Sequence, residues 1–506
     1  MLQTAKIFQD GMILQRQKPV TVWGTGESGE KVHVEIQGKS AETTADDSGR
    51  WELRLPSLEA SEEETLVIKT KKESTTFHQV AVGEVWLAGG QSNMEFFMRY
   101  EKHIENEKPK CENPRVRFFD VPEAAFDGQL EDFDYSRMGI WRKATPEDIE
   151  YFSAVGYYFQ QDIEKSLDVP VGIVGCNWGG TTSSAWMSPE TVEKVGKPWM
   201  DAYREQTADM DMKSYWKKQH TNALNDRGNL FEDAFTEFFS PKTRTPEEIG
   251  QFFSAMAGEI DEFMNELQPQ AVPGCLYEHM LKTIARFTVR GVLWYQGESD
   301  DVPGRQELYT AMLTGLISDW RALLKDETLP FLVVQLPGWE SWLESVNIDY
   351  AAIRRCQQEV SETVENVFLC SIGDVGERYD IHPKNKKTVG ERLALLARGH
   401  IYGERILCDA PKAKSITRRD GQIRIVFENA DGGLEIKGEK LEALTIKQNG
   451  CPVDYSAEVD GDELVLKAEV KPDAELQVMF AQDKWYQVNL YNKAGVPAVP
   501  FVLFVK

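Results

Sequence analysis

One serine of this chain lies where a nucleophile is expected. The run Gly90-Gln91-Ser92-Asn93-Met94 directly follows the apolar residues 85–88, which predicts a serine hydroxyl at a turn from a strand into a helix. Backbone N–H groups at such a turn can point at a developing oxyanion, and a helix start adds partial positive charge. A serine at a helix start is also a common N-cap, so this motif alone leaves both roles for Ser92 open.

A candidate base and a candidate orienting acid lie far downstream. A serine attacks at neutral pH only with such help, and Asp380-Ile381-His382-Pro383 places a carboxylate two residues before an imidazole. Two residues apart in an extended segment project to the same side, so Asp380 can reach the imidazole nitrogen that faces away from Ser92. His382 taken alone is as easily explained as a surface or capping residue. Together the motifs predict Ser92, His382 and Asp380 as a catalytic triad.

Two glycines follow another apolar run. Trp178-Gly179-Gly180-Thr181 comes just after residues 171–175, so the glycines are expected past a strand end, where a backbone can approach a ligand closely. We predict that the Gly180 N–H joins that of Ser92 in an oxyanion hole, with Gly179 as the next choice. A tight turn that needs positive φ explains the same pair of glycines equally well.

Gln296 and Glu298 form a third block, after the apolar residues 292–295. The Gln296 carboxamide is expected near the same sheet edge, where it can donate a hydrogen bond to the oxyanion. Glu298 can orient His382, bind a substrate hydroxyl or fasten the loop that carries Gln296, and the last two roles are favoured. A role in substrate binding or structure is predicted for three residues, Glu298, Asn93 and Gly179.

These blocks occur in the order that a known family has them. The chain resembles the sialate O-acetylesterase-like members of the SGNH (GDSL-type) hydrolases, which are carbohydrate acetylesterases. The blocks that carry the resemblance are residues 84–95, 178–181, 294–299 and 380–383. Residues 10–15 and 489–492 look like the two ends of the family, whereas residues from about 195 to 272 look least like it.

The chain departs from the wider superfamily at two places. Many relatives have asparagine in the block that here holds Gln296, which makes Gln296 the donor candidate. The superfamily usually has Asp-x-x-His, but here Tyr379 stands three residues before His382 and Asp380 stands two before it. Asp380 is therefore favoured over Glu298 as the orienting acid, and the choice between them stays open.

The family resemblance and the hydrophobic periods of the chain both bear on its fold class and domain organisation. The resemblance implies an α/β fold, the SGNH-hydrolase (flavodoxin-like) three-layer parallel sheet with flanking N- and C-terminal β-rich domains. Hydrophobic periods divide the 506 residues in the same way, and a chain of this length suits about three domains. They predict a β-sandwich-like domain at 1–83, the catalytic domain at 84–403 and a β-rich domain at 404–506.

Individual elements of the catalytic domain can be predicted from their periods. Helical periods cover residues 153–167, 307–324, 350–364 and 388–402, and apolar strand runs cover residues 170–176, 289–295, 331–336 and 367–372. Alternation of this kind predicts a mostly parallel sheet with its active site at the carboxyl ends of the strands.

A charged segment at about 195–272 is predicted to be a helical insertion in the catalytic domain. Its aromatic residues can form a lid or a sugar-binding wall, but at helical spacing they are more often core. We therefore expect them to be core. They are Trp199, Tyr203, Trp216, Phe231, Phe238 and Phe239.

Charge and composition exclude several classes of partner. A formal net charge of −25 argues against nucleic acid and anionic membrane surfaces, since both need basic patches. No stretch approaches the roughly 20 apolar residues of a membrane span. The carboxylate of a sialic acid would need a local cation, and Arg99, Arg305 and Arg378 are candidates. The oligomeric state is not predicted by these features.

Cysteine usage bears on metals and on location. The seven cysteines are scattered and odd in number, which predicts free thiols. No Cys-x-x-Cys or His-rich cluster has metal-ligand spacing, so neither a metal nor another cofactor is expected. Residues 1–14 contain no signal-peptide pattern, which predicts a cytoplasmic protein.

Two functions of different classes fit these observations. The leading prediction is a serine carbohydrate O-acetylesterase that removes O-acetyl groups from sialic acid or acetylated oligosaccharides through an acetyl-enzyme intermediate. The alternative is a carbohydrate-binding protein with an inactive hydrolase domain. A peptidase or lipase fits less well, because the chain lacks a Gly-x-Ser-x-Gly elbow around Ser92. The sugar and the position of its acetyl group are not predicted.

Overall fold

The chain folds as two compact units. The structure, a computed structural model, describes residues 1–131, 138–221, 244–255, 267–341, 348–419, 421–471 and 474–505. The first unit comprises Met1–Lys242, Ala255–Gln296 and Ala311–Phe331, and the second comprises Thr243–Ser254, Gly297–Thr310 and Leu332–Lys506. The division crosses the predicted catalytic domain, and the predicted domain boundaries stay a prediction.

The N-terminal part of the first unit is made of strands, as its alternating pattern predicts. Inward residues are buried and outward residues exposed in alternation along β4 and β6, because successive side chains of a strand point to opposite faces. One sheet has the order β1-β3-β6, and in the other β4 pairs with β5 and β7. The strands are β1 (Gln3–Thr4), β2 (Ile13–Gln15), β3 (Val20–Thr25), β4 (Lys31–Ile36), β5 (Lys39–Thr44), β6 (Arg50–Leu55) and β7 (Ser61–Lys69).

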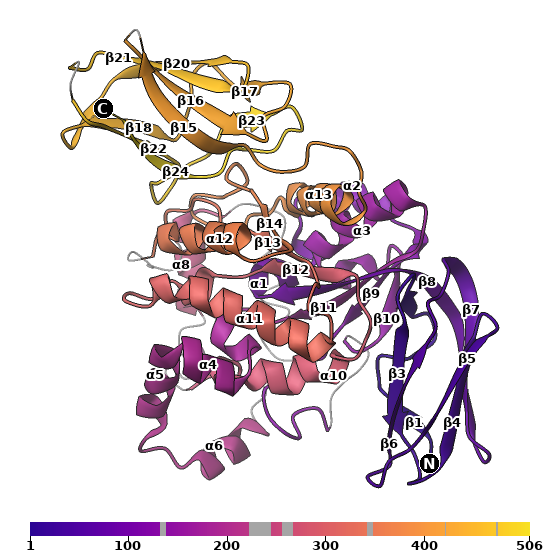
Figure 1. Ribbon diagram of the computed structural model, residues 1–506. Helices are drawn as coiled ribbons and strands as arrows, with labels where there is room; N and C mark the ends of the chain where they lie inside the picture. The colour runs from indigo at the N-terminus through magenta and orange to yellow at the C-terminus, as the bar shows by residue number, and fades with distance from the viewer. Residues whose placement is uncertain are drawn as a thin grey trace. The chain divides into compact units, whose positions relative to one another are not determined.

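One long strand, β8 (Ser74–Gly90), runs from this β-rich part into the central sheet of the first unit (Figure 1). Its first part pairs with β7 and β2, and its second part pairs with β11 and β12. The predicted boundary between residues 83 and 84 therefore falls inside a continuous strand.

The central sheet of the first unit has the strand order β10-β9-β11-β8-β12. β11 and β12 run parallel to β8, β9 runs parallel to β11, and β10 alone is antiparallel. All residues of β11 and β12 are buried, as expected for parallel strands covered on both faces. The prediction of a mostly parallel sheet is confirmed. The strands are β9 (Asn113–Asp120), β10 (Trp141–Ala144), β11 (Val171–Asn177) and β12 (Gly291–Tyr295).

The helix predicted at residues 153–167 is present in the first unit as α3 (Ala154–Leu167). Ser153 caps α3 by accepting a hydrogen bond from the Gly156 N–H at 3.1 Å, which satisfies one of the unpaired donors of the first turn. The apolar face of α3 packs against β11. The other helices are α1 (Ser92–Glu95), α2 (Ile104–Glu107), α10 (Lys282–Ile284) and α11 (Tyr309–Leu324), whose first two residues belong to the second unit. No helix among the described residues is long and apolar enough to cross a bilayer.

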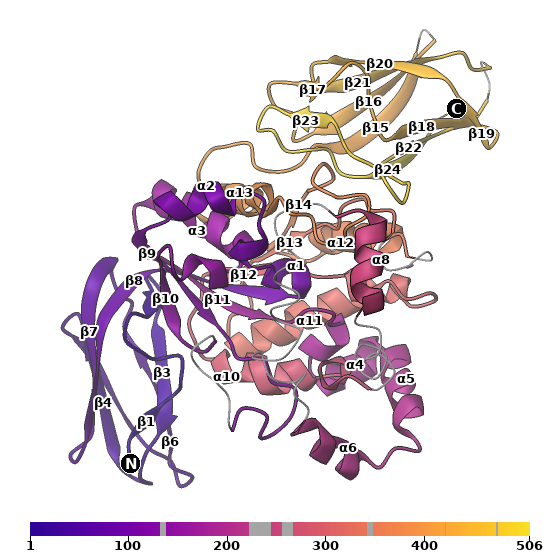
Figure 2. The ribbon, with the colours of Figure 1, turned by 180° about the vertical axis from the view of Figure 1, so that it is seen from behind.

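The predicted insertion at about 195–272 is helical in its described parts. α4 (Pro189–Val195), α5 (Lys197–Thr207) and α6 (Met212–Gln219) lie together in the first unit (Figure 2), and α8 (Pro246–Ala255) follows. The expectation that its aromatics are core is wrong for Trp199, Tyr203 and Trp216, which are half-buried. Met200 and Tyr215 are among the residues of these helices that are buried. Three predicted core residues, Phe231, Phe238 and Phe239, lie outside the described residues.

The second unit contains the last strands and helices of the α/β part. β13 (Phe331–Val334) and β14 (Val367–Cys370) are neighbours. α12 (Ala351–Thr363) and α13 (Lys386–Leu396) both pack against β14. A π-helical turn, η10 (Ala397–Ile401), continues α13. These elements confirm the predicted strand and helix runs from residue 331 to 402.

The C-terminal part of the second unit is a β-sandwich. Two four-stranded antiparallel sheets, β15-β16-β21-β20 and β19-β18-β22-β24, face each other (Figure 2) and enclose one apolar core that includes Ile425, Ile446 and Val478. The strands are β15 (Lys412–Arg419), β16 (Gln422–Glu428), β17 (Leu434–Ile436), β18 (Leu444–Gln448), β19 (Cys451–Val453), β20 (Tyr455–Asp460), β21 (Glu463–Ala468), β22 (Leu476–Phe480), β23 (Leu490–Asn492) and β24 (Phe501–Val505).

Candidate active site

Three strand ends of the first unit meet at one edge of the sheet. Asn177, the last residue of β11, and Tyr295, the last residue of β12, both lie opposite Gly90, the last residue of β8. The segments that follow therefore leave the sheet side by side, as expected where parallel strands end together. This register brings the blocks of Ser92 and Gln296 to one place.

The turn before Ser92 can be made only with glycine. Gly90 has a φ of 142°, and a Cβ there would lie 2.1 Å from the Tyr295 carbonyl oxygen. Gln91 is extended and forms the N-cap, so Ser92 is the first residue of α1 and not its cap. Ser92 is half-buried. Because α1 has only four residues, its dipole adds less than the sequence-based argument assumed.

Glu95 joins the serine helix to the glycine loop. Its Oε2 accepts a hydrogen bond from the Gly179 N–H at 2.7 Å. A Cβ on Gly179 would lie 3.3 Å from the Ser92 Cβ, so the loop packs directly against the serine. Since the Gly179 N–H is engaged by a carboxylate, Gly180 is the better candidate for the oxyanion hole. Sequence reasoning missed Glu95, although its position three residues after Ser92 places the two on one side of a helical turn.

The loop after β11 is held by a network of hydrogen bonds. Gln296 is fully buried, and its Nε2 donates to the Thr181 carbonyl at 3.1 Å. The Thr181 hydroxyl donates to the Trp178 carbonyl at 2.7 Å and accepts from Trp186 Nε1 at 2.9 Å. Gly180 itself is exposed, with a φ of 73° and no atom within 4 Å of where a Cβ would stand. The loop is therefore fixed while its tip stays open to a ligand.

The predicted base lies in the second unit, in the segment before α13. His382 and Asp380 are both buried. Asp380 Oδ1 accepts the backbone N–H of His382 at 2.8 Å and lies 3.6 Å from His382 Nδ1. The second distance is an ion-pair distance, longer than a hydrogen bond. The spacing of two residues thus puts the carboxylate beside the imidazole, as predicted.

Two buried lysines accompany this pair. Lys384 Nζ lies 3.1 Å from Asp380 Oδ2, and the Lys384 N–H donates to Glu377 Oε1 at 2.8 Å. Lys386, the first residue of α13, is fully buried. Burial lowers the pKa of Lys386 to about 7, while the negative charge of Glu298 acts in the opposite direction. Glu298 thus supplies a counter-charge to a buried ammonium, which fits its predicted structural role.

The ionisation of the pair is set by burial and by these neighbours. Burial by itself raises the pKa of Asp380, but the neighbouring His382 imidazole and the charge of Lys384 outweigh it and hold that pKa well below its usual range. Burial lowers the pKa of His382, and the Asp380 carboxylate opposes this shift without cancelling it. The imidazole is therefore a neutral base at neutral pH, with an ionised acid beside it.

The predicted site residues fall into two groups. The structure brings Ser92, Gly179, Gly180 and Gln296 together in the first unit, with Asn93 buried in α1. It brings Asp380 and His382 together in the second unit, which also holds Glu298. The pairing of Ser92 with His382 stays a prediction.

Of the three predicted cations, Arg99 and Arg378 have aromatic neighbours. The guanidinium of Arg99 lies over the rings of Phe97 and Tyr100. Arg378 is exposed and forms an ion pair with Glu340. Neither arrangement identifies a carboxylate site.

Several carbohydrate esterases are similar to this chain. A family described as carbohydrate esterase, sialic acid-specific acetylesterase matches residues 193–397. The sialate O-acetylesterase of Mus musculus is 25% identical over 485 residues, which cover 88% of this chain and 82% of the relative. That of Homo sapiens is 23% identical, covering 99% of this chain and 92% of the relative. A crystal structure of a carbohydrate acetylesterase from Xanthomonas citri superposes with a TM-score of 0.76 and 26% identity, covering 99% of both chains.

Over residues 193–397 the chain matches the sialic acid-specific acetylesterases among the carbohydrate esterases, and it is similar to sialate O-acetylesterases over most of its length.

The superposition on the carbohydrate acetylesterase from Xanthomonas citri confirms the predicted fold class, an SGNH-type α/β fold with flanking β-rich parts. The matched range holds Gln296, Glu298, Asp380 and His382, whereas Ser92 and the glycine loop lie before it. It also contains residues 195–272, which the sequence indicated to be the least family-like part of this esterase. The insertion is thus within the range that the family model recognises.

Proposed function

We propose that this carbohydrate esterase removes O-acetyl groups from sialic acid or acetylated oligosaccharides, with Ser92 as its nucleophile. One observation carries the assignment to Ser92. The register of β8, β11 and β12 ends the three strands together and sets Ser92 against the loop of Gly179 and Gly180, with Gln296 bonded to the same loop. A serine beside open backbone donors is the arrangement that acyl transfer requires.

The reaction proceeds through an acetyl-enzyme. Ser92 Oγ attacks the acetyl carbonyl, and its proton passes to the neutral His382 imidazole. His382 then gives a proton to the departing sugar oxygen, and a water molecule activated by the same base releases acetate. Asp380 holds the imidazole and stabilises its charged form, because its own carboxylate stays ionised at neutral pH.

Backbone donors stabilise the negative charge that develops on the carbonyl oxygen. The N–H groups of Ser92 and Gly180 are two of them. The Gln296 carboxamide, whose nitrogen donates to the Thr181 carbonyl of the same loop, is proposed as a third donor. Each donor of this kind is worth about 3 kcal/mol of transition-state stabilisation.

A carbohydrate-binding protein with an inactive hydrolase domain is the weaker alternative. Sugar-binding surfaces of β-modules need aromatic platforms, since rings stack on sugar faces. In the described part of the C-terminal sandwich, Val502 and Phe504 are the exposed large apolar residues, which leaves Phe504 as the one exposed ring. The retained Ser92, His382 and Asp380 also favour catalysis.

Acetate release is the direct test. Wild type and Ser92→Ala are compared on 4-nitrophenyl acetate, an acetylated xylo-oligosaccharide and a 9-O-acetylated sialic acid. We expect Ser92→Ala to lose about 10⁴-fold or more in kcat on every substrate that the wild type turns over. The better of the two sugars then gives the substrate class.

A matched control separates the nucleophile from a general effect of losing a hydroxyl. Ser318 is exposed on α11, and its Oγ donates to the Thr314 carbonyl, so Ser318→Ala should keep full activity. Turnover by Ser92→Ala equal to that of Ser318→Ala would remove Ser92 from the mechanism. Sugar binding without turnover by the wild type would instead favour the carbohydrate-binding alternative.

A further inference from the structure

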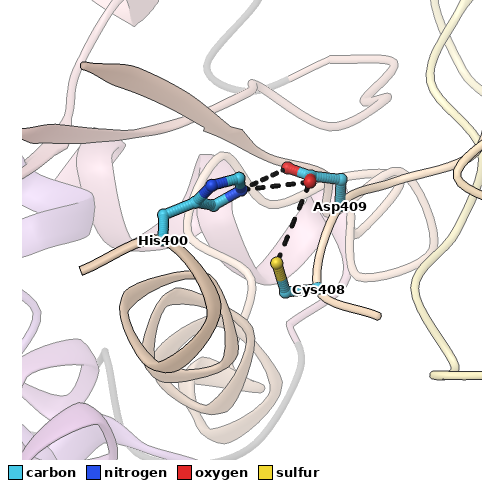
Figure 3. A group of neighbouring side chains, drawn as sticks. All are labelled: His400, Cys408 and Asp409. Atoms are coloured by element: carbon cyan, nitrogen blue, oxygen red, sulfur yellow. Dashed lines mark hydrogen bonds and ion pairs between the residues drawn. The ribbon is translucent and has the colours of Figure 1, made fainter. Parts of the chain in front are cut away.

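Three side chains with metal-binding atoms lie together in the second unit, outside the residues assigned to catalysis. They are His400, Cys408 and Asp409, and one imidazole nitrogen, the thiol sulfur and a carboxylate oxygen all lie within 4.8 Å of one another (Figure 3). It is the one such group in the ranges that the structure describes. Sequence reasoning missed this group, because seven residues separate His400 from Cys408 and no Cys-x-x-Cys is present.

The distances fit a small ion after slight adjustment. Around a tetrahedral zinc ion with ordinary bond lengths, ligand atoms lie about 3.3–3.6 Å apart. Here His400 Nε2 lies 2.9 and 3.0 Å from the two Asp409 oxygens, and the Cys408 sulfur lies 3.8 Å from Asp409 Oδ2. Each pair needs to change its separation by no more than about 1.3 Å.

The three groups are held by their surroundings. The His400 ring stacks on Phe368 at 3.9 Å between centroids. A Cβ on Gly399 would lie 2.4 Å from the Cys408 sulfur, so the thiol packs directly against the backbone of η10. Asn492 Nδ2 donates to the Asp409 carbonyl at 2.9 Å. Ligands that are ordered before binding lose little entropy when an ion arrives.

The turn between the histidine and the cysteine is also fixed. Arg398 forms an ion pair with Glu404 at 2.8 Å, and the Glu404 N–H donates to the Arg398 carbonyl at 2.9 Å. This pairing closes the chain on itself just before Cys408.

The donor atoms of the three side chains indicate which ion they would bind. We infer that His400, Cys408 and Asp409 bind a zinc ion, which links the end of η10 to the segment that enters β15. A thiolate, an imidazole and a carboxylate together are a zinc donor set, and the thiolate and carboxylate give the two negative charges that balance a divalent ion. Binding releases the thiol proton and the Nε2 proton to solvent. The side chains of His400 and Asp409 are 27% and 37% exposed, so water can complete the tetrahedron.

Cobalt(II) is the probe that reports this geometry. The full, untagged chain is stripped with a chelator and titrated with cobalt(II), whose bond to a thiolate gives a near-ultraviolet charge-transfer band. We expect one equivalent to produce this band together with the visible bands of a tetrahedral ion, and one equivalent of zinc to abolish both. Cys408→Ser should lose the charge-transfer band, and Cys451→Ser, which removes the exposed thiol, should keep it.

Each outcome decides the proposal. A wild-type chain without the band, or a Cys408→Ser chain with an unchanged band, overturns it and leaves an ordinary His400–Asp409 ion pair beside a thiol. Because Cys408 is buried, Asp409→Asn serves as a second variant that keeps the shape of the site. It should weaken zinc binding by more than about tenfold, and equal zinc affinity in wild type and Asp409→Asn would also overturn the proposal.

Discussion

The two units bring different physical means to the proposed reaction. In the first unit, Ser92 is surrounded by backbone N–H groups, glycines and one carboxamide, and the Glu95 carboxylate that enters this group is bonded to a backbone N–H. In the second unit, His382 is surrounded by buried charges, with Asp380, Lys384 and Lys386 all less than one-tenth exposed.

The difference between the two groups of residues corresponds to two chemical tasks, stabilisation of an oxyanion and transfer of a proton. Stabilising an oxyanion needs dipoles fixed in direction, which hydrogen bonds to a rigid sheet edge supply. Moving a proton needs a base with an adjusted pKa, which burial and neighbouring charges supply. Substitutions in the first group should therefore change kcat and leave the pH profile in place, whereas substitutions around His382 should move the profile.

Asp380 should give the largest effect. Asp380→Ala removes the carboxylate beside His382, so the imidazole loses its orientation and the partner of its charged form. We expect kcat to fall about 10³–10⁴-fold. Glu298→Ala should mainly raise KM, and steady-state kinetics on one acetylated sugar compares the two variants. Equal turnover in wild type and Asp380→Ala, with a large loss in Glu298→Ala, would exchange their roles.

Gln296 should come next. Gln296→Ala removes the proposed oxyanion donor and the bond to Thr181, and kcat should fall about 10²–10³-fold while the acid limb of the pH profile stays in place. Gln335→Ala is the matched control, because Gln335 is also buried, follows a strand and donates to a backbone carbonyl. It should lose stability but keep kcat. A similar fall in kcat for both variants would mean that Gln296 acts only by packing.

Glu95 should have a smaller effect on the same part of the reaction. Glu95→Ala frees the Gly179 N–H and lets the loop move away from Ser92, for which we expect a loss of kcat of up to about 100-fold with little change in KM. In Glu95→Gln the amide oxygen can still accept the Gly179 hydrogen bond, so most of the activity should return. Equally low kcat in both variants would show that the negative charge of Glu95, and not its hydrogen bond, is required.

Substitution of Lys384 tests how the charges around His382 set the pH dependence of the reaction. Burial holds the pKa of His382 below its usual value of 6.5, and the charge of Lys384 lowers it further. The wild-type kcat/KM should therefore stay high as pH falls to 6.5 and decline only below it. Lys384→Met removes a positive charge from beside the imidazole, so the His382 pKa rises and the acid limb moves to higher pH.

The control for Lys384→Met is Lys387→Met, which removes a nearby lysine of α13 whose side chain is 39% exposed. Its acid limb should coincide with that of the wild type, as measured by kcat/KM across pH. An acid limb that stays in place or moves to lower pH in Lys384→Met would contradict the electrostatic explanation.

Glu84 should affect stability and leave the chemistry alone. It is fully buried in β8 and pairs with Arg16 at 2.7 Å and Arg290 at 2.7 Å. Glu84→Gln leaves two guanidinium groups with a neutral partner, and the free energy of unfolding should fall by about 3 kcal/mol. Glu52→Gln, which also loses two cationic partners but at the surface, should cost less than about 1 kcal/mol. Denaturant unfolding compares the two.

The pH dependence of the Glu84 effect has a defined sign. Burial raises the Glu84 pKa, but the two arginines outweigh it and the net pKa is lowered from 4.5. Its contribution is therefore fully present above about pH 4.5 and is lost as pH falls through the lowered value. The stability gap between wild type and Glu84→Gln should shrink in acid, and a gap that widens there would refute the assignment.

Sequence patterns predicted the parts of the fold that depend on local period. The helices α3, α12 and α13 and the strands between them lie within a few residues of their predicted bounds, because amphipathic and apolar runs are local signals. The meeting of the Ser92, Gly180 and Gln296 blocks was also predictable, since each follows an apolar strand of one parallel sheet.

Features that depend on tertiary packing were not predicted. Nothing in the pattern around Glu95 indicates a bond to Gly179, and nothing in Lys384 and Lys386 indicates burial, because lysine is almost always exposed. The half-buried Trp199, Tyr203 and Trp216 were misjudged for the same reason, since helical spacing fixes which face is apolar but not how much covers it. The cytoplasmic location and the triad itself stay predictions.

The continuity of β8 limits how genes for such proteins can be rearranged. A module joined by a linker can be gained or lost by recombination at its border, as happens with many appended binding domains. Here β8, which ends two residues before Ser92, begins in the N-terminal module, and Gln15 and Arg16 of that module bond Glu84 within the strand. A recombination event that exchanged the N-terminal module would also have to replace part of β8, the strand that leads to Ser92. The N-terminal module and the central sheet should therefore have been inherited together.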